Sequence, residues 1–214
     1  SRMADVASAS LYASNLGYGE ANKPPVIKLA RVAAEGQLQD LRRDKASGDV
    51  KAGFEGFSQS NAAPALAALF PRQGNINLHL DKLPATAILS HIKEAMLAQK
   101  TGATPAPDLS QSLSGLLQQA GTTLDFRDTY LKSDTLEATL TGGFQALPAA
   151  PRGFGGKALL SVRGFDAALK RLKGNTADPQ AMGIAGALTG IMLAGHVAPA
   201  DDKTILYELE VSGT

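Results

Sequence analysis

Apolar and polar side chains alternate along three stretches of the chain, as they do in strands with one buried face. One face would carry Ile76, Leu78 and Leu80 in the first stretch, Ala158, Leu160 and Val162 in the second, and Ile205, Tyr207, Leu209 and Val211 in the third. In the first stretch the opposite face would carry Asn75, Asn77, His79 and Asp81. The alternation predicts three half-buried strands.

Three longer segments combine such strands with a polar turn. They are residues 25–57, 122–144 and 196–213. Two apolar-alternating runs separated by polar turn residues are typical of a β-hairpin. We therefore expect an antiparallel sheet assembled largely from hairpins.

Other segments have the three- and four-residue apolar spacing of helices. One begins after Pro84 and presents Ala85, Ile88, Leu89, Ile92 and Met96. A second follows Asp108, a residue suited to an N-cap, and would end at Gly121. A third carries Leu169 and Leu172 and would be closed by Gly174.

The longest apolar run, 181–195, is about 15 residues and is shorter than a bilayer-spanning helix requires. Asp178 and Pro179 predict a helix start, and Gly195 predicts a left-handed C-terminal residue. Glycines inside this helix, at 183, 186 and 190, each cost roughly 1 kcal/mol relative to alanine. Either another backbone approaches them closely, or the helix leaves an apolar surface for a ligand, a membrane or a partner protein.

Two parts of the chain repeat the same order of strand, loop, strand and helix. Residues 49–59 match 135–145 in pattern, and 71–92 match 151–172. Self-similarity of this kind indicates a repeated structural unit. We therefore predict an α+β fold: a curved antiparallel sheet built from repeated hairpin and strand–helix units, with helices packed on one face. The chain, 1–214, is expected to be a single domain made of two related units, about 25–100 and 109–213.

Composition narrows the possible functions. The chain is 44% hydrophobic and 19% charged, which excludes bulk disorder. Its 21 Lys and Arg against 20 Asp and Glu provide no basic field for nucleic acid, so we expect no nucleic-acid partner. Cysteine is absent, which removes disulfides and thiolate chemistry without fixing the compartment.

No catalytic or metal-binding motif is present in the sequence. The three histidines, His79, His91 and His196, lack the spacing of a zinc site, and no Gly-x-Ser-x-Gly elbow occurs. Acids distant in sequence could still converge, but nothing in their spacing selects a pair. We therefore predict a protein that is not an enzyme and needs no cofactor or metal.

The apolar helices suggest a different role, the binding of a lipid or another hydrophobic small molecule in a groove between sheet and helices. Methionine adapts to irregular apolar shapes. The expected ligand-binding residues are Ile88, Leu89, Ile92, Met96, Met182, Leu188 and Met192. The alternatives are that these side chains only fill a core, or that the protein is a scaffold or interaction module that docks a partner protein or a membrane surface.

Three segments, 74–92, 155–172 and 188–213, resemble an uncharacterised family of proteobacterial cell-envelope proteins with AsmA-like or periplasmic repeats. The resemblance extends over about residues 25–213 and rests on pattern. It implies a periplasmic location, an N-terminal signal or anchor outside this chain, and a role with envelope lipids or envelope proteins. It transfers no site residues.

Overall fold

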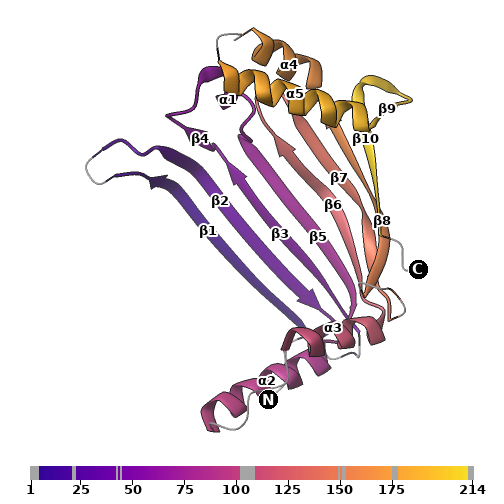
Figure 1. Ribbon diagram of the computed structural model, residues 1–214. Coiled ribbons are helices and arrows are strands. Elements are labelled where there is room, and N and C mark those ends of the chain that lie inside the picture. Colours follow the sequence, from indigo (N-terminus) through magenta and orange to yellow (C-terminus); the bar gives the residue numbers. More distant parts are fainter. Residues whose placement is uncertain are drawn as a thin grey trace.

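One continuous antiparallel sheet forms most of this protein, as a computed structural model shows (Figure 1). The structure describes residues 5–20, 23–41, 43, 45–101, 109–148, 150, 153–174 and 178–211. The sheet has 10 strands in the order β1-β2-β3-β5-β6-β7-β8-β10-β9, and β4 pairs with β2 beside this path. The predicted α+β class and the curved antiparallel sheet are confirmed.

Most of the strands are long, and only β4 and β9 are short. The strands are β1 (Val6–Tyr18), β2 (Ile27–Gln39), β3 (Ala46–Glu55), β4 (Ser58–Gln59), β5 (Gln73–Leu83), β6 (Thr123–Lys132), β7 (Glu137–Ala146), β8 (Phe154–Arg163), β9 (His196–Ala198) and β10 (Asp201–Val211). The three predicted hairpins are present as the antiparallel pairs β2–β3, β6–β7 and β9–β10. The sequence analysis did not predict β1.

The helices lie at the two ends of the strands (Figure 1). They are α1 (Pro64–Ala67), α2 (Ala85–Thr101), α3 (Leu109–Ala120), α4 (Phe165–Lys173) and α5 (Pro179–Ala194). In Figure 1, α1, α4 and α5 gather at one end of the sheet and α2 and α3 at the other. Asp108, the predicted cap of α3, lies outside the described residues, and Gly121 ends α3 with φ +63°.

Strand direction explains this division. β5 leads into α2 and β8 leads into α4, and the two strands are separated by β6 and β7. Strands three places apart in an antiparallel sheet run in opposite directions, so the helices that follow them leave at opposite ends. The order strand, connector, strand, helix occurs over β3-β5-α2 and again over β7-β8-α4.

The densest hydrophobic cluster lies among the helices at one end rather than along the sheet. It consists of Ala65 and Leu66 of α1, Leu169 and Leu172 of α4, and Ala181 and Ala185 of α5, with Ala63, Leu69, Ile184, Leu188 and Met192 packed against it. Leu172 is fully buried. This cluster packs α1 together with α4 and α5, two helices that are far from α1 in sequence.

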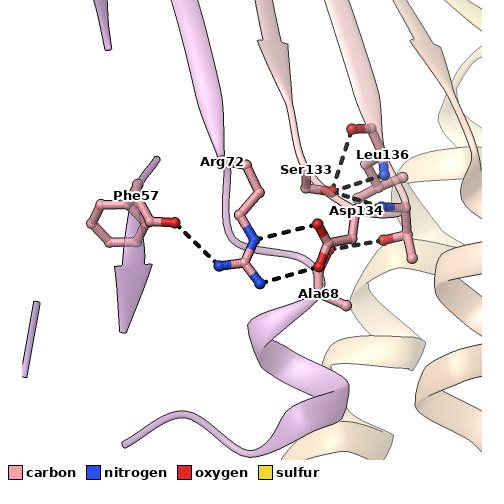
Figure 2. Close-up of polar contacts among 7 residues, drawn as sticks. Phe57, Ala68, Arg72, Ser133, Asp134 and Leu136 are labelled. Carbon is pink, nitrogen blue, oxygen red and sulfur yellow. Dashed lines mark hydrogen bonds and ion pairs between the residues drawn. The ribbon is translucent and has the colours of Figure 1, made fainter. Parts of the chain in front are cut away.

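A polar network attaches this helical end to the sheet (Figure 2). Arg72 donates to both carboxylate oxygens of Asp134, with Nε–Oδ1 3.3 Å and Nη2–Oδ2 3.1 Å, and to the carbonyl of Phe57 at 3.2 Å. The Ser133 hydroxyl accepts from the amides of Thr135 and Leu136, and Thr135 Oγ1 donates to the carbonyl of Ala68 at 3.2 Å. The turn between β6 and β7 is thereby tied to the segment that carries α1.

Candidate functional site: an apolar sheet face

The two faces of the sheet differ sharply in chemistry. Directly paired residues of neighbouring strands lie on the same face. One row across the sheet reads Val50, Leu78, Phe126, Gly142, Ala158 and Leu209, and the next row on that face reads Leu38, Gly48, Leu80, Leu124, Phe144, Gly156 and Val211. A row on the opposite face reads Ser8, Gln37, Asp49, His79, Asp125, Gly143, Lys157 and Glu210. We call these the apolar face and the polar face.

The apolar face is largely open. Its exposed side chains include Leu11 (66%), Ile76 (51%), Leu209 (45%), Leu131 (44%), Phe154 (43%) and Val50 (39%). In the described part of the chain no helix crosses the middle of the strands, and no second sheet is present (Figure 1). An antiparallel sheet normally buries one face against a core and hydrates the other. Here the face with core-like composition has no covering layer.

Aromatic rings lie side by side on this face. Phe126 of β6, Phe144 of β7 and Phe154 of β8 form two consecutive edge-to-face contacts, with ring centroids 6.2 and 6.3 Å apart. Aromatic rings supply large apolar contact areas at low cost in side-chain entropy. The row gives the apolar face a preorganised aromatic cluster near the end of β7 and the start of β8.

On the polar face, ion pairs and hydrogen bonds join side chains of neighbouring strands. His79 Nδ1 lies 2.8 Å from Asp49 Oδ1, and Arg127 approaches the same carboxylate at 3.9 Å. Tyr12 donates its hydroxyl proton to Glu35, and this hydrogen bond is the main cause that raises the pKa of the tyrosine. Asn77 is nine-tenths buried, and its Oδ1 has no partner among the described residues. A cavity of about 540 Å³ lies over these side chains.

Contacts at the helical end fix where α5 meets the sheet. Tyr207 lies on the apolar face of β10 and donates its hydroxyl to the carbonyl of Ile191 in α5 at 2.7 Å. Burial raises the pKa of this tyrosine.

At the start of β10, hydrogen bonds from the Thr204 hydroxyl and the Lys203 amide, together with the Arg163 guanidinium, lower the pKa of Asp201.

Gly195, which follows α5, has an extended backbone at φ −97° and ψ −177°, so the predicted left-handed conformation is wrong. Glycine is needed at position 195 because a side chain would not fit there. A Cβ atom at this position would lie 2.3 Å from Ile205 Cγ2 and 2.9 Å from the carbonyl oxygen of Leu206. The close approach lets the end of α5 rest on the apolar face of β10.

The glycines inside α5 have the opposite environment. A Cβ atom added at Gly183, Gly186 or Gly190 would meet nothing within 4 Å. The expectation that another backbone packs against them is therefore wrong within this structure, because all three face outward. The predicted helix bounds and the Asp178 cap, which accepts from the amides of Gln180 and Ala181, are confirmed.

The structure separates the predicted ligand-binding residues into two sets. Ile88, Leu89, Ile92 and Met96 belong to α2, and Met182, Leu188 and Met192 belong to α5, at opposite ends of the sheet (Figure 1). Leu89, Ile92, Met96 and Met182 are exposed, whereas Ile88 is half-buried and Leu188 and Met192 pack against the helical core. One groove does not contain both sets.

A second cavity, of about 530 Å³, lies where the helices meet the sheet. Its lining includes Phe165, Met192 and Ile205, together with Arg163 and Asp202. Met192 is the one predicted residue that borders this cavity.

The described residues include no group of three or more His, Asp or Glu side chains that could hold a metal ion. No helix in the described part of the chain is long and apolar enough to cross a membrane.

Sequence reasoning missed the apolar face as a site, although it assigned several of its members to one side of their strands. The sequence alone does not show whether another part of the protein covers that side of the strands.

Comparison with family models, with curated proteins and with solved structures finds no match for this chain. The geometry therefore carries the functional argument.

Proposed function

We propose that this protein binds a lipid or another hydrophobic molecule on the apolar face of its sheet, and that it does so without a catalytic step. One observation carries the proposal: side chains of core-like composition extend from β1 to β10, and no layer of described residues lies over the middle of the strands. Monomeric soluble proteins rarely leave an apolar area of this extent open unless something binds there. The proposed binding site is therefore on the sheet, whereas the sequence predicted it on the helices.

The total surface supports the same proposal. The chain exposes 13743 Å², whereas a compact monomer of 22.1 kDa exposes roughly 9,300 Å² by the usual scaling of surface with mass. A bound acyl chain would cover part of the excess. Each buried methylene contributes about 0.8 kcal/mol before ordering costs, so the affinity for a fatty acid should rise with the length of its acyl chain.

The proposal includes two finer features of the fold. The units β3-β5-α2 and β7-β8-α4 are related repeats, and helices at both ends lie over the apolar face. The shared element order supports the first feature. The contacts of Gly195 with Ile205 and Tyr207 support the second feature for α5.

We place the protein in the periplasm, where envelope lipids would be its ligands. The resemblance of 74–92 and 155–172 to cell-envelope repeats supports this location. Fractionation of the host organism, with an antibody against this chain, tests it.

A tryptophan reporter tests ligand binding directly, because the chain has no tryptophan of its own. Ile76→Trp places the reporter on the apolar face, and Thr141→Trp places a matched reporter at an exposed position on the polar face of β7. With a brominated fatty acid as the probe, we expect saturable quenching of the Ile76→Trp protein and little quenching of the control. Equal quenching of both, or of neither, would contradict the proposal.

The exposed edge of the sheet favours a second candidate function, a scaffold that docks a partner protein. Among the strands that the structure describes, β1 pairs only with β2. Val6–Tyr18 contains no charged residue and no proline, two features that commonly protect an edge strand. Native mass spectrometry of protein extracted from its host distinguishes the candidates. Bound lipid supports the first, and a stoichiometric protein partner without lipid supports the second.

A further inference from the structure

Two adjoining cavities lie on the polar face of the sheet, over the neighbouring strands β1, β2, β3, β5 and β6. The first is the cavity of about 540 Å³ described above, and the second has a volume of about 460 Å³. Both are lined by Tyr12, Glu35 and Lys51, so they meet along the sheet. We call the two cavities together the polar groove. Each has the size of a small-molecule site.

Two rows of directly paired residues form the floor of the polar groove. One row consists of Ser10, Glu35, Lys51 and Asn77, and the next consists of Tyr12, Ala33, Gly53, Asn75 and Tyr130. In the second row, small residues separate two tyrosines that are 58% and 36% exposed. The strands of these tyrosines are four places apart, which corresponds to roughly 19 Å of sheet. The second cavity is therefore elongated and has an aromatic side chain at each end.

Several polar groups of the groove have no protein partner. Lys51 is exposed and takes part in none of the ion pairs among the described residues. Tyr12 engages only one carboxylate oxygen of Glu35. Asn77 is nine-tenths buried and lines the first cavity, and its Oδ1 is unpaired in the described part of the chain. Buried polar atoms are normally hydrogen-bonded, so an unpaired one in a cavity indicates a place for a water or a ligand.

The charges along the groove balance, which selects the class of ligand. In the first cavity Glu35 and Asp49 oppose Lys51 and Arg127. The second cavity adds one residue of each sign, Arg31 and Glu55. An anion or a cation would meet like charges in either cavity. A neutral ligand that both donates and accepts hydrogen bonds can use the cations and the carboxylates together.

We propose that the polar groove binds a neutral oligosaccharide. A sugar ring has C–H groups on its two faces and hydroxyl groups around its edge. The faces stack on the rings of Tyr12 and Tyr130, which offer large and rigid apolar surfaces. The hydroxyls donate to Glu35, accept from Lys51 and bond with the amide group of Asn77.

A peptide is the main alternative occupant, because its backbone is also neutral and polar. Peptides are commonly bound by extension of a sheet edge or by apolar side chains in pockets. The polar groove lies on a sheet face and is lined largely by polar side chains. These features favour an oligosaccharide.

The inference is independent of the proposed function, because a lipid would bind on the opposite face of the sheet. The two sites together would let the protein hold a hydrophobic molecule and a sugar at the same time.

A tryptophan reporter tests the groove, since the chain has no tryptophan. Tyr12→Trp keeps an aromatic ring in the groove, and Thr141→Trp places a matched reporter on the same face outside both cavities. The neutral probes are cellotriose, maltotriose and tri-N-acetylchitotriose, and the comparison probes are trigalacturonate and N-acetyl-triglycine amide. We expect at least one neutral trisaccharide to change the fluorescence of Tyr12→Trp saturably and to leave Thr141→Trp unchanged.

Further substitutions in the Tyr12→Trp protein test the assigned contacts. Tyr130→Ala and Lys51→Ala should each weaken trisaccharide binding about tenfold. Tyr18→Ala removes a tyrosine that is 75% exposed and lies outside both cavities, so the affinity should not change. Circular dichroism checks that every variant is folded.

Three results would overturn the proposal. They are no saturable response to any of the three neutral trisaccharides, tighter binding of trigalacturonate or of the peptide amide, and an unchanged affinity in the folded Tyr130→Ala variant. The Ile76→Trp assay with a fatty acid reports on the apolar face alone. A failure of the polar groove is thus distinguishable from a failure of the proposed lipid site.

Discussion

Glycine has two opposite uses within one short segment of this protein. At Gly190 a side chain would extend into open space, whereas at Gly195 it would collide with Ile205 and the backbone of β10. The same chemical change should therefore have opposite effects on stability at two positions only five residues apart in sequence.

The variants Gly190→Ala and Gly195→Ala form a matched pair for this prediction. Gly190→Ala should raise the free energy of unfolding by up to about 1 kcal/mol, because alanine restricts the unfolded chain and favours the helix. Gly195→Ala should lower it by roughly 1–3 kcal/mol through overpacking. Urea denaturation measures both, and a loss of stability in Gly190→Ala would show that its outer side is covered in solution.

At the scale of the element, a side-chain hydrogen bond joins α5 to the sheet near the C-terminal end of the helix. Tyr207 donates to Ile191, a residue of the last turn. Burial raises the pKa of the Tyr207 phenol, so the folded state favours the protonated form of this side chain. The stability gained from this preference is complete below the ordinary tyrosine pKa. It is lost as the pH rises through the raised pKa.

We expect Tyr207→Phe to remove about 0.5–1.5 kcal/mol of stability at neutral pH. Amide hydrogen exchange should accelerate in the last turn of α5 and remain unchanged in α4, whose contacts are made by Leu169 and Leu172. The difference between the variant and the unmodified chain should disappear above the raised pKa, where the phenol is ionised and cannot donate. A difference that persists there would contradict the assigned role of the hydroxyl.

At the scale of the whole molecule, one sheet joins two groups of helices that have few direct contacts with it. Among helix–strand pairs, α3 makes the main contacts, with β5 and β7. The continuous antiparallel pairing from β1 to β10 is the structural connection between the ends. We therefore expect the chain to unfold as one cooperative unit.

Two single-tryptophan variants test this expectation. Met96→Trp reports on α2 at one end and Met182→Trp on α5 at the other, and both positions are exposed. Their thermal transitions should coincide with each other and with circular dichroism at every temperature. Separate midpoints would show that the ends unfold independently and that the two units are separate domains.

Local sequence patterns were sufficient for much of the fold. Alternation identified the apolar side of β5, β8 and β10, turn chemistry identified three hairpins, and Asp178 with Pro179 identified the start of α5. These features depend on contacts between near neighbours along the chain. β1 escaped prediction because alanine and serine alternate along Val6–Ser10, so its two sides differ little in hydrophobicity.

Only the tertiary structure decided which apolar side chains remain uncovered. The sequence places Met182 and Leu188 in the same apolar helix, but Leu188 packs against the helical core whereas Met182 remains exposed. It also places α2 and α4 in similar strand–helix patterns, but strand direction sends them to opposite ends of the sheet. Burial and strand direction depend on partners distant in sequence, and so the open face of the sheet became visible only when all its strands were paired.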